Sequence, residues 1–147
     1  MYVNGHEEDD LDLPLIDSKD LFGELKTDDT FWLMFDLRKK ESFKINHIAY
    51  ENIINIDPEL LNDIEDFQNL FDVLQTVLHN DDFVKFKNLR KFEKVVIYTD
   101  NKNFLSFEFD YLVKFKNLLD EDNLQNLELL KGGFDSWLKF ISKNDSG

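Results

Sequence analysis

Short apolar runs alternate with helix-like segments along this 147-residue chain, and this alternation restricts its fold more than any other feature. Residues 31–37 (FWLMFDL) and 94–98 (KVVIY) are almost continuously apolar, as expected of strands buried on both faces. Residues 53–56 and 127–130 predict two further strands, and residues 13–16 form another short apolar run. Alternating strands and helices predict an α/β fold with a central parallel sheet of about five strands, flanked by helices on both faces.

Several of the intervening segments show helical spacing. The clearest runs from Ile64 to Leu78, with apolar residues three and four positions apart. Further helices are predicted from Ser18 to Lys26, where Asp17 or Ser18 can act as the cap, and from Ser106 to Leu119. Residues 80–91 are polar and are expected to connect two elements. A last helix should follow the glycine pair, with an inner face made of Phe134, Trp137, Leu138 and Ile141.

Composition excludes several classes of function. The chain has no cysteine, which excludes disulfides, cysteine–zinc sites and thiolate nucleophiles. The net charge of −14 argues against a general binder of nucleic acid. No apolar run approaches the roughly 18 residues of a membrane span, and the polar start does not resemble a signal peptide. His6, His47 and His79 are far apart and follow no metal-binding spacing, so we expect no metal and no cofactor.

The chain is expected to form one domain. Residues 1–12 are acidic and poor in apolar groups, which predicts a flexible tail, and residues 143–147 form a short polar tail. The domain should therefore span residues 13–142. Ligand sites in parallel sheets form at the carboxyl ends of the strands. The loop that follows the strand at residues 94–98 is thus the first place to look for a site.

Several motifs occur in the same order as in a known family. They are Asp36-Leu37-Arg38, Asn46-His47-Ile48 with residues 52–56 (NIINI), residues 94–99 (KVVIYT), and residues 130–137 (LKGGFDSW). Together they resemble the D-x-R, G-H-I, A-I-N-I-P, strand-to-cysteine and L-x-G-G-x-x-x-W motifs of the rhodanese-like family. The resemblance implies the rhodanese-like α/β fold. It also implies that Asp36, Arg38, His47, Gly132, Gly133 and Trp137 are structural positions of the family.

The chain departs from the family at its reactive loop. The position of the family's nucleophilic cysteine carries Thr99, and the arginine position falls on or near Phe104. Asp100 adds a negative charge where the family holds an anion. The degenerate loop comprises Thr99, Asp100, Asn101, Lys102, Asn103 and Phe104. Threonine stays protonated at neutral pH and needs a nearby base to act as a nucleophile, so the resemblance implies a domain without catalytic residues.

Other features suggest where a partner could bind. We define the basic cluster as Lys85, Lys87, Arg90 and Lys91, a local reversal of the overall acidity. It is a candidate for docking an acidic protein, although a charged connecting loop is the simpler interpretation. Phe104 either fills the vacated pocket or anchors a partner.

In lacking the reactive cysteine, the chain resembles the rhodanese-like modules of fungal ubiquitin-specific proteases. It implies a cytoplasmic interaction module that positions a deubiquitinating enzyme on a protein of the endosomal-sorting or ubiquitin machinery. Two alternatives stay open: a domain that regulates its own protease intramolecularly, and an enzyme of sulfurtransferase or phosphatase type that uses an atypical site.

Overall fold

A five-stranded parallel sheet organises the chain, as a computed structural model that describes residues 11–27, 29–101 and 106–145 shows. The strands lie in the spatial order β1-β5-β4-β2-β3, and each pairing between neighbours is parallel. Their bounds are β1 Leu15–Ile16, β2 Trp32–Asp36, β3 Ile53–Asn55, β4 Lys94–Tyr98 and β5 Leu127–Leu130. The predicted α/β class and the central position of the KVVIY strand are confirmed.

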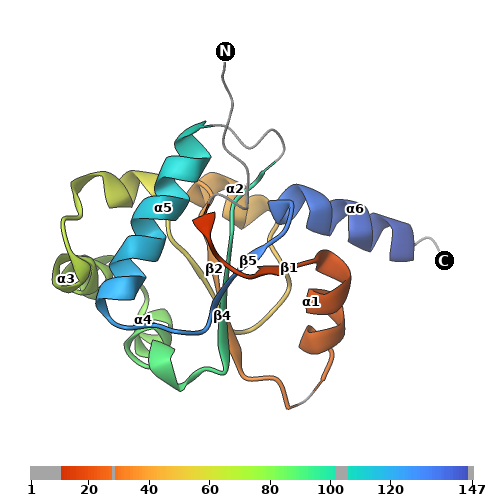
Figure 1. Ribbon diagram of the computed structural model, residues 1–147, viewed down its shortest axis with the longest axis horizontal. Coiled ribbons are helices and arrows are strands. Elements are labelled where there is room, and N and C mark those ends of the chain that lie inside the picture. The colour runs from red at the N-terminus through yellow and green to blue at the C-terminus, as the bar shows by residue number, and fades with distance from the viewer. Residues whose placement is uncertain (1–10, 28, 102–105, 146–147) are drawn as a thin grey trace.

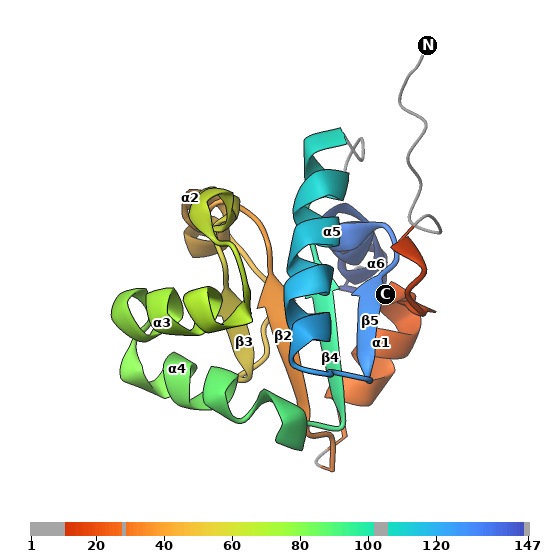
Figure 2. The ribbon, with the colours of Figure 1, turned by 60° about the vertical axis from the view of Figure 1, so that its left-hand side comes forward.

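Helices cover both faces of this sheet (Figures 1 and 2). The side chains of β2 and β4 alternate between two apolar clusters, because successive residues of a strand point to opposite faces. One cluster packs beneath α3, α4 and α5, and the other beneath α1 and α6. The bounds are α1 Ser18–Leu25, α2 Lys40–Ile45, α3 Phe67–Val77, α4 Asn80–Lys87, α5 Ser106–Glu121 and α6 Gly133–Asp145, with 3-10 helices η2 Pro58–Asp63 and η3 Leu89–Lys91.

Local sequence explains where several helices begin. The carboxylate of Asp17 accepts the backbone N–H of Asp20 at 2.8 Å, which caps α1 as predicted. Asp66 caps α3 in the same way through the N–H of Asn69. Asp57 caps η2, with Pro58 at the first helical position where its missing N–H costs nothing.

The predicted start of the long amphipathic helix was wrong. The helix was expected from Ile64, but α3 begins at Phe67, because Asp66 caps it there. Ile64 instead ends η2 in extended conformation and is 4% exposed. The apolar spacing therefore identified Ile64 correctly as a buried residue, although a break separates it from α3.

Residues 80–91 are not a connecting loop, which corrects a second prediction. They form α4 and η3, and bury Phe83, Phe86 and Leu89 at three-residue intervals. The inner face predicted for the last helix also needs one correction. Phe134 and Trp137 are buried, but Leu138 is 42% exposed.

The domain bounds of 13–142 stay a prediction, but the structure describes packed residues near both ends of the chain. Leu11 is 3% exposed and belongs to the cluster beneath α5, so packing begins before residue 13. Helix α6 continues to Asp145. Residues 1–10 of the predicted acidic tail and residues 146–147 of the polar tail lie outside the described residues. Among the helices that the structure describes, none is long and apolar enough to cross a membrane.

Candidate functional site

The carboxyl ends of β2, β3 and β4 meet at one edge of the sheet, where parallel sheets form their ligand sites. The chain leaves β2 into Leu37 and Arg38, and leaves β3 into Ile56 and Asp57. It leaves β4 into Thr99, the first residue of the degenerate loop. The predicted loop and the D-x-R motif are therefore neighbours in space.

A buried ion pair between Arg38 and Asp36 lies at this edge of the sheet. Nε of Arg38 lies 3.1 Å from both carboxylate oxygens of Asp36, and one terminal nitrogen, Nη2, lies 2.7 Å from Oδ2. Tyr98 donates its hydroxyl to the same carboxylate at 2.6 Å. Arg38 also donates to the carbonyl of Asn46 at 2.6 Å, and its guanidinium lies 4.0 Å from the ring centre of Phe134. The motif thus joins β2, β4, the turn after α2, and α6.

Electrostatics keep the Arg38 side chain charged. Burial alone would lower the pKa of Arg38, but the hydrogen bond and charge of Asp36 outweigh it, and the pKa is raised. Burial also raises the pKa of the Tyr98 phenol, with the Asp36 carboxylate adding to the effect. Tyr98 therefore stays a neutral hydroxyl donor, and Arg38 stays a cation whose charge is largely matched inside the fold.

The start of the degenerate loop is anchored to α6. Thr99 is 3% exposed, and its carbonyl accepts the N–H of Phe134 at 2.8 Å. The carbonyl of Asp100 accepts the N–H of Asp135 at 3.1 Å. Gly133 makes this approach possible: it has φ +60, and a Cβ there would lie 2.5 Å from the carbonyl oxygen of Thr99. The glycine pair therefore serves a close backbone contact, and two amides at the start of α6 are satisfied by the loop.

Two carboxylates occupy the described part of this loop region. Glu108, in the first turn of α5, is 8% exposed and accepts the backbone N–H of Asn101 at 2.9 Å. The Asp100 side chain is 59% exposed, and its Oδ1 lies 3.7 Å from Nη1 of Arg38. Partial burial raises the pKa of Asp100; the Glu108 and Asp36 charges act in the same direction, while Arg38 opposes them. Two carboxylates thus lie at the start of the degenerate loop.

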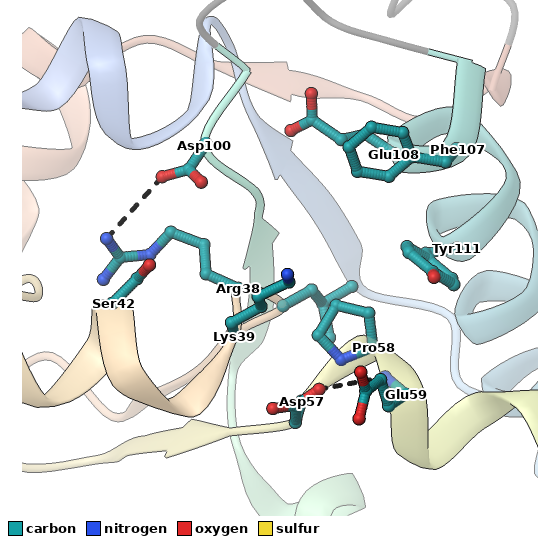
Figure 3. Close-up of a pocket in the computed structure, with 11 residues that line it drawn as sticks. Arg38, Lys39, Ser42, Asp57, Pro58, Glu59, Asp100, Phe107, Glu108 and Tyr111 are labelled. Atoms are coloured by element: carbon teal, nitrogen blue, oxygen red, sulfur yellow. Dashed lines mark hydrogen bonds and ion pairs between the residues drawn. The ribbon is translucent and has the colours of Figure 1, made fainter.

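A cavity of about 450 Å³ opens above these residues (Figure 3). In Figure 3, Phe107, Glu108 and Tyr111 of α5 stand across from Asp57 and Glu59, with Arg38 and Asp100 pointing toward each other. Residues from four segments line it, namely Leu37, Arg38, Lys39, Ser42, Asp57, Pro58, Glu59, Asp100, Phe107, Glu108 and Tyr111. Of the predicted site residues, Arg38 and Asp100 line this cavity.

Sequence reasoning missed the wall that α5 supplies. Phe107, Glu108 and Tyr111 share one helix face, at spacings of three and four residues. Their position just after the degenerate loop was the available signal, because a helix that leaves such a loop starts at the carboxyl edge of the sheet. Asp57 and Glu59 were visible as a helix start, although not as part of a site.

His47 and Trp137 lie at a second, smaller cavity of about 340 Å³. Nδ1 of His47 lies 2.8 Å from the carbonyl oxygen of Phe43, so that nitrogen carries the hydrogen. The imidazole also stacks on the Phe43 ring, with ring centres 4.0 Å apart. Through these two contacts, His47 stabilises the turn that follows α2.

The basic cluster lies apart from the larger cavity, on α4 and η3. Nζ of Lys85 donates to the carbonyl of Glu51 at 2.7 Å, and Arg90 pairs with Asp122 at 2.9 Å. Nζ of Lys87 lies 5.8 Å from the ring centre of Phe83, and Lys91 is exposed. Lys102, Asn103 and Phe104 of the degenerate loop lie outside the described residues.

Within residues 11–27, 29–101 and 106–145, no three His, Cys, Asp or Glu side chains gather closely enough to hold a metal ion. The carboxylates around the larger cavity are therefore spread around its walls rather than converging on one point.

Comparison with solved structures places the fold. A rhodanese-like domain from Anabaena matches with a TM-score of 0.50 at 17% identity, covering 86% of this chain and 74% of that one. A Rhodopseudomonas palustris protein of unknown function, named a possible tyrosine phosphatase, matches with a TM-score of 0.54 at 14% identity, covering 95% and 87%. At such identities the likeness concerns the fold alone.

Two curated yeast proteins are similar in sequence. Ubiquitin carboxyl-terminal hydrolase 7 of Saccharomyces cerevisiae is 35% identical over 116 residues, 74% of this chain and 11% of that protein. Ubiquitin carboxyl-terminal hydrolase 5 of the same yeast is 26% identical over 113 residues, 73% of this chain and 14% of that protein. The chain thus spans only a small part of these relatives. Because the family profile of the rhodanese-like domain matches residues 18–140, this chain belongs to the rhodanese-like family.

Proposed function

We propose that this domain is a non-catalytic protein-interaction module that recruits or positions a ubiquitin-specific protease on a partner. One observation carries the proposal: the carboxylates of Asp100 and Glu108 lie at the loop that resembles the family's reactive loop. Glu108 accepts the backbone N–H of Asn101, and Asp100 faces Arg38. A thiosulfate or phosphate anion would meet these two charges, and would have to compete with Glu108 for the loop amide.

The residue at the cysteine position supports the same conclusion. Thr99 has a hydroxyl that stays protonated at neutral pH and cannot carry a persulfide sulfur as a thiolate does. The residue is 3% exposed, so a substrate would need the loop to move before reaching it. Its carbonyl is also tied to α6 through Phe134, which resists such movement.

The wider setting of the module rests on its relatives. Similarity to two yeast ubiquitin carboxyl-terminal hydrolases supports a parent protein of the same kind. We propose that this parent protein works in the cytoplasm. The partner would then belong to the ubiquitin or endosomal-sorting machinery and would bring the protein to endosomes. The basic cluster stays a candidate docking surface for an acidic partner, and its Lys87, Arg90 and Lys91 are exposed. Phe104 stays a candidate anchor for a partner.

Activity assays on the purified domain test the proposal. Sulfur transfer from thiosulfate to cyanide, and hydrolysis of p-nitrophenyl phosphate, should both stay at the buffer rate. Turnover that disappears in Thr99→Ala would show that the domain is an enzyme with an atypical site. The intramolecular alternative makes a different prediction: the isolated domain should bind the protease domain of its own parent protein in calorimetry, and an external partner should not be needed.

A further inference from the structure

The cavity of about 450 Å³ has a size suited to a ligand, and apolar, aromatic and charged residues line it. Its volume of about 450 Å³ lies in the range of small-ligand pockets, about 300–1,000 Å³. Leu37 and Pro58 supply apolar surface, and Phe107 and Tyr111 supply aromatic surface. The remaining lining residues are polar or charged. Such a cavity can hold a side chain with an apolar stem and a polar end.

The charge around the cavity is mainly negative. Four carboxylates line it, those of Asp57, Glu59, Asp100 and Glu108, against two cations, Arg38 and Lys39. Arg38 adds little free positive charge, because it is already paired with the buried carboxylate of Asp36. The carboxylates come from both sides of the cavity, so an entering cation would meet negative charge on each side (Figure 3).

The aromatic wall points to the same class of ligand. Phe107 is 54% exposed, and its ring meets Tyr111 edge-on, with centres 6.1 Å apart and planes at 71°. Exposed aromatic rings at a cavity attract cations through their negative faces, and guanidinium groups also stack on them. An anionic ligand would gain nothing from this wall and would be repelled by the carboxylates.

We propose that this cavity binds a lysine or arginine side chain presented by a basic segment of a partner protein. The inference rests on the proposed function, because it names the chemistry of a partner for the same edge of the sheet. The stem of the side chain would pack on Phe107 and Tyr111, and its charged end would reach the carboxylates on the opposite side. The proposed cation site would thus include Asp100 of the degenerate loop.

Fluorescence anisotropy with a labelled peptide of alternating arginine and glycine tests this inference. The peptide should bind the domain, and binding should weaken as salt is raised. A matched peptide with citrulline in place of arginine keeps the shape but not the charge, and should not bind. A peptide with glutamate in place of arginine should also fail to bind.

Variants locate the site. Glu59→Lys reverses one exposed charge of the cavity and should weaken binding of the arginine peptide about tenfold, as expected for the loss of one charge-assisted contact. Glu93→Lys makes the same charge change just before β4, at the opposite end of that strand, and should leave binding unchanged. Phe107→Ala should weaken binding several-fold, whereas Phe31→Ala, at a similarly exposed phenylalanine, should not.

Three outcomes would overturn the inference. If Glu93→Lys weakens binding as much as Glu59→Lys, the peptide responds only to net charge. If the citrulline peptide binds equally well, no cation is recognised. If the peptide does not bind but spermidine binds the domain in calorimetry, the cavity takes a free polyamine. None of these outcomes would contradict the proposed function. That function would be contradicted separately, by turnover that depends on Thr99.

Discussion

The hydroxyl of Tyr98 donates a 2.6 Å hydrogen bond to the carboxylate of Asp36, and both residues are fully buried. The two residues occupy the last positions of neighbouring strands, where they are partners in register. Asp36 also receives the backbone N–H and the side chain of Arg38, so one carboxylate ties together the ends of β2 and β4. The floor beneath the degenerate loop is thus held by buried polar contacts.

Tyr98→Phe should destabilise the domain, because it removes a hydrogen bond to a buried charge. We expect a loss of about 1.5–3 kcal/mol in the free energy of unfolding, measured by urea denaturation. Tyr50→Phe is the matched control, since its hydroxyl accepts a long 3.3 Å bond from an uncharged donor, the N–H of Trp32. Equal effects of the two variants would contradict the importance assigned to Asp36.

Arg38→Met should be more damaging. It leaves the Asp36 carboxylate buried without its cation, which costs about 3–5 kcal/mol. Arg90→Met removes a bidentate partner of Asp122 on the surface, where the arginine side chain is 59% exposed, and should cost less than about 1 kcal/mol. Thermal and urea unfolding would compare the two, and a small effect of Arg38→Met would mean that the pair is not a structural element.

Gly133→Ala should loosen the contact between the loop and α6. The new Cβ would lie 2.5 Å from the carbonyl oxygen of Thr99, at a φ of +60 that L-residues rarely adopt. We expect a lower melting temperature. Gly23→Ala is the control in α1, where nothing lies within 4 Å, and it should stabilise the domain by about 0.5–1 kcal/mol through helix propensity. A neutral Gly133→Ala would show that the contact can relax.

The strands were predictable because they are buried on both faces. Every residue of β2 is buried, so nothing polar interrupts its run before Asp36. The bounds predicted at residues 94–98 and 127–130 agree with β4 and β5. The helix α4 was not predictable in this way. Its sequence, NDDFVKFK, contains only two buried residues among charged ones, so it has the composition of a loop.

The site was predictable only in part. The motifs indicated the loop after β4 and the Asp36–Arg38 pair, which both lie at the expected edge. The contribution of Glu108 depends on how α5 packs as it leaves the loop, and no local pattern encodes that angle. The cavity is formed by side chains from separate segments, and its negative charge becomes apparent only when they are assembled.

Thr99→Cys should not create an efficient sulfurtransferase. The new thiol would still lie in a buried position beside Asp100, and Glu108 would still occupy the loop amide of Asn101. An anionic donor about 4 Å from one of these carboxylates would be repelled by roughly 4 kcal/mol at an effective dielectric of 20. The thiosulfate–cyanide assay should therefore show no gain over the parent domain. Efficient turnover by this variant would mean that the loop still admits anions.

Reversing charge in the basic cluster tests the second candidate surface. The triple variant Lys85→Glu, Lys87→Glu and Lys91→Glu should stay folded, because Lys87 and Lys91 are exposed and the Lys85 amine donates to the carbonyl of the exposed Glu51. Two new carboxylates in the last turn of α4 should cost about 0.3–1 kcal/mol each through the helix dipole. If an acidic partner docks here, its association rate should fall and lose much of its salt dependence.

The comparison needs a variant with the same net charge. Lys19→Glu, Lys44→Glu and Lys131→Glu change three exposed lysines outside the cluster and should leave partner association unaffected. Biolayer interferometry over a range of salt concentrations, with a partner recovered by pull-down, would compare the two triple variants. If the cluster variant binds that partner at the parent rate and with the parent salt dependence, docking takes place elsewhere. The variant that weakens a given partner then identifies the surface it uses: the cluster triple variant for docking at the basic cluster, and Glu59→Lys for docking at the proposed cavity site.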